Sequence, residues 1–122
     1  MTRLLVVDDE LSILEALQDV LSMEGYEVVT AYNGAEGLRC IGEQRPDLVL
    51  LDLMMPVMDG RELLRRVRED PALKGLPVII MSAGRIADEE RQAASATLAK
   101  PFDLDHLLRT LAQHQKPKPP GS

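Results

Sequence analysis

Short aliphatic runs alternate with longer amphipathic stretches along the whole chain. The runs lie at residues 4–7, 28–29 with their flanks, 48–51 and 78–81, and a weaker one surrounds Leu98. Their length and their content of Val, Ile and Leu predict five β-strands. Strands that are apolar almost throughout are typical of a parallel sheet whose two faces are both covered.

The stretches between these strands have the spacing and the boundary residues of helices. Apolar residues keep helical spacing over residues 13–21, and Gly25 follows as a helix terminator. Asn33 and Asp59 each precede a glutamate by three residues, which is typical of a helix N-terminus, and a last helix begins near Asp103. Strands that alternate with helices predict a doubly wound α/β domain.

The composition fits one soluble globular domain. The chain has 122 residues, of which 45% are hydrophobic and 28% charged, and a chain of this length buries about two-thirds of its unfolded surface. We expect the domain to comprise residues 1–114. Residues 115–122 are Pro-rich and basic, which predicts an extended tail or linker.

Charge and hydropathy exclude several classes of protein. The formal net charge is −6 and no run of Lys or Arg forms a stripe, so we expect no direct binding to nucleic acid. No apolar run approaches the roughly 20 residues of a membrane helix, and acids at positions 8–10 interrupt any signal peptide. These features predict a cytoplasmic protein without membrane contact. Cys40 is the single cysteine and is interpreted as a small core residue.

Polar side chains stand where the predicted strands end. Asp8 and Asp9 follow the first strand in LLVVDDE, Asp52 ends the third, Ser82 ends the fourth and Lys100 follows the fifth. Ligands of doubly wound sheets bind beyond the carboxyl ends of the strands. We therefore expect these residues, which are far apart in sequence, to meet at one edge.

Each of these residues also has an ordinary structural interpretation. An acid at position 8 or 9 can cap the first helix, a serine is common at turns, and a lysine is usually solvated. Asp52 is harder to explain in this way, because an ionisable group at the end of a buried strand must be paired or neutralised. Crowded carboxylates raise one another's proton affinity unless a hard cation lies among them, so the set predicts a Mg²⁺ site suited to phosphate chemistry.

Taken in order, these elements resemble the receiver domain of two-component response regulators. The matching motifs cover nearly the whole chain up to about residue 114 and are LLVVDDE, DLVLLDLMMPVMDG, VIIMSA and LAKPF. The resemblance implies a flavodoxin-like five-stranded parallel sheet with strand order 2-1-3-4-5 and helices on both faces. It also implies a phosphorelay switch that catalyses its own phosphorylation and dephosphorylation.

The resemblance implies a role for each site residue. Asp52 would accept a phosphoryl group from a phosphohistidine of a histidine kinase or a histidine phosphotransfer protein. Asp9 would bind Mg²⁺ directly and Asp8 mainly through water, with Asp52 and the backbone carbonyl of Met54 as further ligands, and Mn²⁺ would serve as a substitute.

Three further residues have roles implied by the same resemblance. Ser82 would donate a hydrogen bond to the phosphoryl group and Lys100 would neutralise one of its oxygens. Pro101 would follow a cis peptide bond that orients Lys100.

Two features depart from the family pattern. The position three residues before the lysine is usually aromatic and is Thr97 here, so readout through a buried aromatic is not expected. Ser82 and Lys100 are only 18 positions apart, which predicts a short fourth helix within residues 85–100. Little apolar area holds such a helix, so we expect it to be mobile or displaced. The surface for a homodimer or an output partner therefore cannot be taken from the family.

Three alternatives to the phosphorylated receiver share parts of this sequence pattern. A phosphatase with an aspartyl nucleophile usually has a second acid two residues later, where this chain has Met54. A flavodoxin-like cofactor binder needs a Ser/Thr-rich phosphate loop after the first strand, and LLVVDDE provides none. A receiver-like binding module that works without phosphorylation remains as the alternative.

Overall fold

The computed structural model describes residues 2–53, 55, 58–84 and 86–114. Within them, five strands alternate with five helices, and no helix has the length and apolar character needed to cross a membrane. The elements are β1 (Arg3–Val7), α1 (Leu11–Met23), β2 (Glu27–Ala31), α2 (Gly34–Gln44), β3 (Leu48–Asp52), α3 (Gly60–Glu69), β4 (Val78–Ser82), α4 (Asp88–Ala93), β5 (Ala96–Ala99) and α5 (Leu104–His114).

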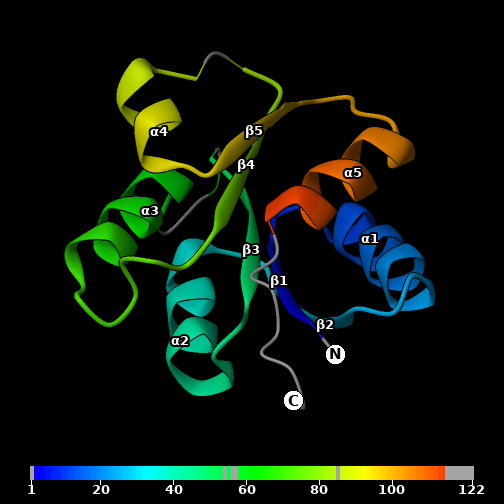
Figure 1. Ribbon diagram of the computed structural model, residues 1–122, viewed down its shortest axis with the longest axis horizontal. Helices are drawn as coiled ribbons and strands as arrows, with labels where there is room; N and C mark the ends of the chain where they lie inside the picture. Colours follow the sequence, from blue (N-terminus) through cyan, green and yellow to red (C-terminus); the bar gives the residue numbers. More distant parts are fainter. Residues whose placement is uncertain (1, 54, 56–57, 85, 115–122) are drawn as a thin grey trace.

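The strands form one parallel sheet in the order β2-β1-β3-β4-β5. Figure 1 shows α1 and α5 on one face of this sheet and α2, α3 and α4 on the other. The predicted doubly wound fold and its strand order are therefore confirmed. The order reverses between β1 and β3, and in such sheets the ligand site lies at this reversal.

The core consists of two hydrophobic clusters, one on each face of the sheet. Successive side chains of a strand point to opposite faces, so Leu5 and Val7 belong to one cluster while Leu4 and Val6 belong to the other. All four are fully buried. Cys40 is buried in the first cluster, where burial raises the pKa of its thiol, as expected for a core cysteine.

The helix starts lie where the sequence predicts them. Asn33, Asp59 and Asp103 each accept, with a side-chain oxygen, a hydrogen bond from the backbone N–H three residues later, at 2.8, 3.0 and 2.7 Å. A cap of this kind stabilises a helix by about 0.5–2 kcal/mol. At the end of α1, Gly25 has a φ of 94°, a conformation that favours glycine.

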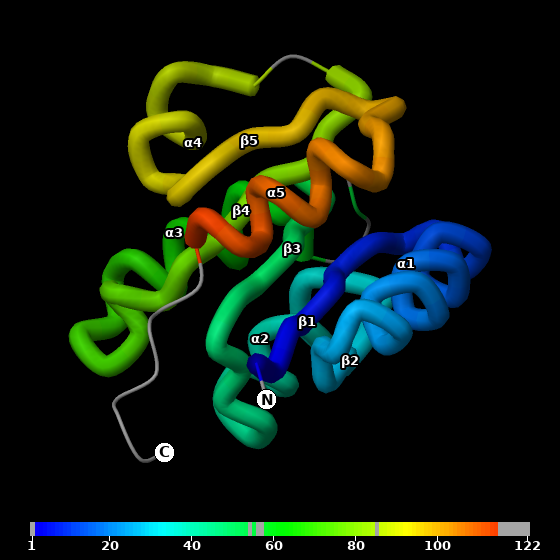
Figure 2. Tube along the Cα trace, turned by 45° about the vertical axis from the view of Figure 1, so that its right-hand side comes forward, coloured from blue at the N-terminus to red at the C-terminus, as the bar shows by residue number. Residues whose placement is uncertain are grey.

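The fourth helix is short, as predicted, and polar contacts tie it to α3. It has six residues, none of them fully buried, and Figure 2 shows it beside β5. Arg68 of α3 donates from Nε to the carbonyl of Ala93 at 2.6 Å, and from Nη1 to the carbonyls of Lys74 and Leu76 at 3.0 and 2.7 Å. Arg61 forms an ion pair with Glu90. That this helix is mobile stays a prediction.

Replacement of Arg68 by alanine is expected to loosen α4. Three carbonyls lose a charged donor, so the free energy of unfolding should fall by about 1–3 kcal/mol. Amide hydrogen exchange in residues 88–94 should become faster. Exchange as slow as in the wild type would show that Arg68 does not hold the helix.

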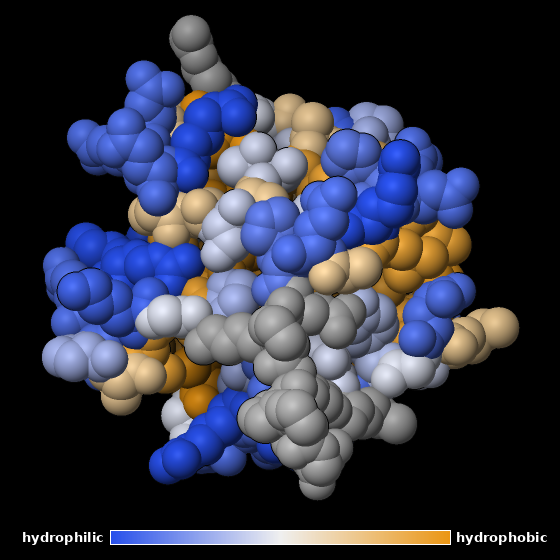
Figure 3. Space-filling view, in the orientation of Figure 1, coloured by the Kyte–Doolittle hydropathy of each residue, from blue (hydrophilic) through white to orange (hydrophobic). Residues whose placement is uncertain are grey.

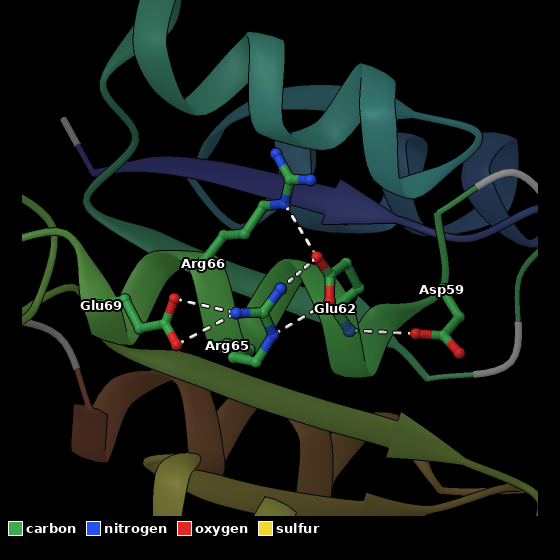
Figure 4. A network of polar contacts seen from close by, with 5 residues as sticks. All are labelled: Asp59, Glu62, Arg65, Arg66 and Glu69. Carbon is green, nitrogen blue, oxygen red and sulfur yellow. Dashed lines mark hydrogen bonds and ion pairs between the residues drawn. The ribbon is translucent and has the colours of Figure 1, made fainter.

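Arg65→Ala is the matched control. Figure 4 shows Arg65 between Glu62 and Glu69 on the exposed side of α3. Exposed ion pairs contribute about 0–1 kcal/mol, so this variant should leave exchange in α4 unchanged.

Candidate functional site

The parallel pairing of β1 and β3 brings the acidic residues together. Val7 lies opposite Leu51 in the register, so Asp8 and Asp52 occupy neighbouring positions at the carboxyl ends of these strands. One carboxylate oxygen each from Asp8, Asp9 and Asp52 lies within 4.8 Å of the others. Asp8 and Asp52 are buried, while Asp9 is exposed.

Lys100 reaches this cluster from the end of β5. Its Nζ lies 2.8 Å from Oδ2 of Asp8 and 3.5 Å from Oδ2 of Asp52. Burial lowers the pKa of Lys100, but the hydrogen bond and the charge of Asp8, with Asp52, outweigh that effect and raise the pKa above its ordinary value of 10.5. The backbone N–H of Lys100 donates to the carbonyl of Ser82 at 2.9 Å, and the peptide bond to Pro101 is cis.

The carboxylate of Asp8 accepts two hydrogen bonds, one on each oxygen. Oδ2 accepts from Lys100, and Oδ1 accepts from the backbone N–H of Glu10 at 2.9 Å. Glu10 is the residue that precedes α1. The side chain of Asp8 therefore orders the entry to the first helix and also carries charge into the cluster.

Ser82 lies at the same edge, one strand away. It is buried, and its Oγ accepts a hydrogen bond from the backbone N–H of Gly84 at 3.1 Å. This contact holds the oxygen in a tight turn after β4. The hydroxyl proton is left to donate to an acceptor in the site.

Thr97 and Met54 are two further residues that the sequence singles out. Thr97 is half-buried on β5 opposite Ile80, and its Oγ1 lies 3.5 Å from Nη1 of Arg91. A small hydroxyl therefore occupies the position where an aromatic would stand in the family pattern. Met54 lies outside the described residues.

The donor set fits a hard divalent cation. The site offers carboxylate oxygens, which Mg²⁺ prefers. The formal charges of three carboxylates exceed that of one ammonium group, so the cluster is net negative although two of its acids are buried. Buried charge of one sign needs compensation, and a bound cation would supply it.

Comparison with known proteins decides the family. Residues 4–112 match the family model described as the response regulator receiver domain. The chain belongs to this family. Receiver domains are switches of two-component signalling, and the family receives phosphoryl groups from histidine kinases.

Curated relatives and solved structures agree with this assignment. The receiver domain is 40% identical over 124 residues to the response regulator MprA of Mycobacterium avium, which covers 95% of this chain and 53% of that protein. It is 41% identical over 111 residues to MprA of Mycobacterium ulcerans, covering 87% of this chain and 47% of the relative. The chain therefore spans about half the length of the curated relatives that it matches.

Two solved structures show the same fold. The response regulator TrrA of Thermotoga maritima, in complex with Mg²⁺ and BeF, is 36% identical with a TM-score of 0.86, covering 93% of this chain and 99% of that one. The chemotaxis protein CheY4 of Vibrio cholerae is 35% identical with a TM-score of 0.83, covering 93% and 98%.

Sequence reasoning missed two glycines next to the site. Gly34 and Gly60 are the first residues of α2 and α3. Gly34 packs tightly against Met58, and Gly60 packs tightly against Asp52 and Leu53. The signal was present, because a glycine directly follows each of the two capping residues, Asn33 and Asp59. Glycine is otherwise unfavourable inside a helix.

Proposed function

We propose that this receiver domain accepts a phosphoryl group on Asp52 from a phosphohistidine of a histidine kinase or a histidine phosphotransfer protein. One observation carries the proposal: the buried carboxylate of Asp52 lies 3.5 Å from the Lys100 ammonium group and shares one cluster with the carboxylates of Asp8 and Asp9. A carboxylate held in this way has a cation beside it that can neutralise the oxygens of an arriving phosphoryl group.

The transfer itself requires little covalent chemistry from the protein. A carboxylate oxygen of Asp52 forms a bond to phosphorus while the bond from phosphorus to the histidine nitrogen breaks. The electron pair stays on that nitrogen, which then takes a proton from solvent. The transition state spreads charge over the equatorial oxygens, so positioning and electrostatic stabilisation dominate. Attack of water on the acyl phosphate later returns Asp52 and inorganic phosphate.

Lys100 and Ser82 bind the phosphoryl group in this proposal. Nζ of Lys100, now 2.8 Å from Asp8, would shift its hydrogen bond toward a phosphoryl oxygen. The Ser82 hydroxyl would donate to a second oxygen. A new hydrogen bond from Ser82 would alter the turn from Ser82 to Gly84, which precedes α4 in the chain. A local change of this kind can shift a neighbouring helix and so alter a distant surface.

The metal ligands proposed for this reaction are Asp8, Asp9 and Asp52, together with the backbone carbonyl of Met54. These residues would hold Mg²⁺, or Mn²⁺ in its place, and the cation would supply neutralisation of charge on the phosphoryl oxygens. Asp8 also binds Lys100, so this residue links the metal site to the phosphoryl-binding side chain.

A hydrophobic hollow beside the site supports docking of the phosphodonor. It has a volume of about 400 Å³ and is lined by Ile13, Ala16, Leu17, Ala83, Lys100, Pro101 and Phe102. Figure 3 shows hydrophobic surface on the side formed by α1 and α5. Because Lys100 is part of both the hollow and the acidic cluster, a helix seated here would bring its phosphohistidine toward Asp52.

Ile13→Lys is expected to slow transfer from a phosphorylated histidine phosphotransfer domain by about tenfold, which corresponds to about 1.4 kcal/mol, because a charged group replaces an apolar side chain at the contact. Phosphorylation by acetyl phosphate, which needs no docking, should not change. Met23→Lys is the control, because Met23 lies at the other end of α1 and is 86% exposed. Equal rates for wild type and Ile13→Lys with the protein donor would place docking elsewhere.

Intact-mass spectrometry tests the proposed function. The protein is incubated with acetyl phosphate with and without Mg²⁺, and then with a phosphorylated histidine phosphotransfer domain. The expected result is a gain of one phosphoryl group that depends on Mg²⁺. No gain from either donor would favour a binding module that works without phosphorylation.

A further inference from the structure

The start of α2 is in close contact with Met58, which lies two residues before α3. The backbone N–H of Gly34 donates a hydrogen bond to the carbonyl of Met58 at 3.0 Å. A Cβ atom at position 34 would lie 2.0 Å from that carbonyl oxygen and 2.8 Å from Cβ of Met58. No side chain fits in this space, so the approach requires glycine.

The backbone conformation does not explain the glycine at this position. Among the described residues, Gly25 is the glycine with a positive φ, so the dihedral angles of Gly34 are accessible to any residue. Helix propensity argues against a glycine here as well. The contact with Met58 is therefore the physical reason for Gly34.

Gly60, the first residue of α3, packs in a similar way against Asp52 and Leu53. Its backbone N–H donates to the carbonyl of Leu53 at 3.0 Å. A Cβ atom at position 60 would lie 2.4 Å from the carbonyl oxygen of Asp52 and 2.6 Å from Cα of Leu53. Met58 is only two residues from Gly60, so a displacement of Met58 is transmitted to the backbone of Asp52 through a tightly packed contact.

We propose that Gly34 is a positioning residue for Asp52. Its hydrogen bond fixes Met58 against the N-terminus of α2, and the close packing of Gly60 against Asp52 and Leu53 makes the position of Asp52 depend on that of Met58. The inference rests on the proposed function, because it concerns the orientation of Asp52 toward Asp8, Asp9 and the metal ligands that they provide. Gly34 itself touches none of the reacting atoms.

Gly34→Ala tests the inference in a phosphorylation assay with acetyl phosphate at increasing Mg²⁺. The concentration of Mg²⁺ that gives half the maximal rate should rise by about tenfold, because a misplacement of about 1 Å at a site costs up to about a hundredfold in rate. The control is Gly42→Ala in the same helix, where a Cβ atom meets no heavy atom within 4 Å. Equal Mg²⁺ dependence of Gly34→Ala, Gly42→Ala and wild type would overturn the inference.

A second measurement uses the unaltered protein, in case Gly34→Ala does not fold. In amide NMR spectra, Mg²⁺ should shift the resonance of Gly34 because its N–H reports the position of the Met58 carbonyl. The resonances of Gly42 and Gly25 should stay in place. A Gly34 resonance that does not move while the protein binds Mg²⁺ would overturn this inference alone. A wild-type protein that neither binds Mg²⁺ nor gains a phosphoryl group would overturn the proposed function as well.

Discussion

Asp52→Asn is expected to abolish the phosphoryl gain from acetyl phosphate. The side-chain amide keeps the volume of the carboxylate but its oxygen is a poor nucleophile, and no other described carboxylate is both buried beside Lys100 and at the end of β3. Intact-mass spectrometry after incubation with acetyl phosphate and Mg²⁺ should show the unmodified mass alone for Asp52→Asn, whereas the wild type should gain one phosphoryl group.

Asp59→Asn is the matched control for this loss. It makes the same chemical change seven positions later, where the side chain caps α3 by accepting from Glu62. Asparagine caps a helix about as well as aspartate, so the variant should fold and be phosphorylated normally. Full phosphorylation of Asp52→Asn would show that another residue is the acceptor. Thermal unfolding of both variants tests whether a loss of phosphorylation results from a loss of the fold.

Lys100→Met is expected to lower the free energy of unfolding by about 3 kcal/mol. The substitution keeps much of the side-chain volume but removes the ammonium group from Asp8, which is fully buried. Loss of one partner from a buried ion pair costs about 3–5 kcal/mol, and we take the lower value because the Lys100 side chain is 15% exposed. Urea unfolding at neutral pH measures the difference.

Mg²⁺ should restore part of this stability. The proposed site exists only in the folded state, so a cation bound there should raise the unfolding midpoint of Lys100→Met more than that of the wild type. Lys74→Met is the control, since that side chain is exposed. Wild-type stability of Lys100→Met without Mg²⁺ would mean that the ion pair with Asp8 contributes no net stability.

The pH dependence of this effect follows from the pKa of Lys100. The folded state raises that pKa above the ordinary value of 10.5. Stabilisation by the charged form is therefore fully present below pH 10.5 and is lost as the pH rises through the folded pKa. The difference in unfolding free energy between wild type and Lys100→Met should stay constant at neutral pH and narrow only in strong alkali.

Much of the fold and of the site follows from local patterns. The apolar run at residues 48–51 indicates a strand that is buried on both faces. The capping residues Asn33 and Asp59 indicate where two helices begin. Once the sheet is parallel, all carboxyl ends meet at one edge, so Asp8, Asp52 and the residues after the later strands must converge. The family motifs then gave each residue its expected role.

Local patterns in the chain are therefore enough to predict the class of fold, the edge at which the site lies and the residue types available there. The partners of these side chains depend on tertiary packing. It pairs Lys100 with Asp8 more closely than with Asp52, joins Arg68 to the carbonyl of Ala93, and seats Gly34 against Met58. Periodicity and capping involve residues that are only a few positions apart. The contacts named above join residues up to 92 positions apart. Their geometry forms only when the whole sheet and its helices have packed.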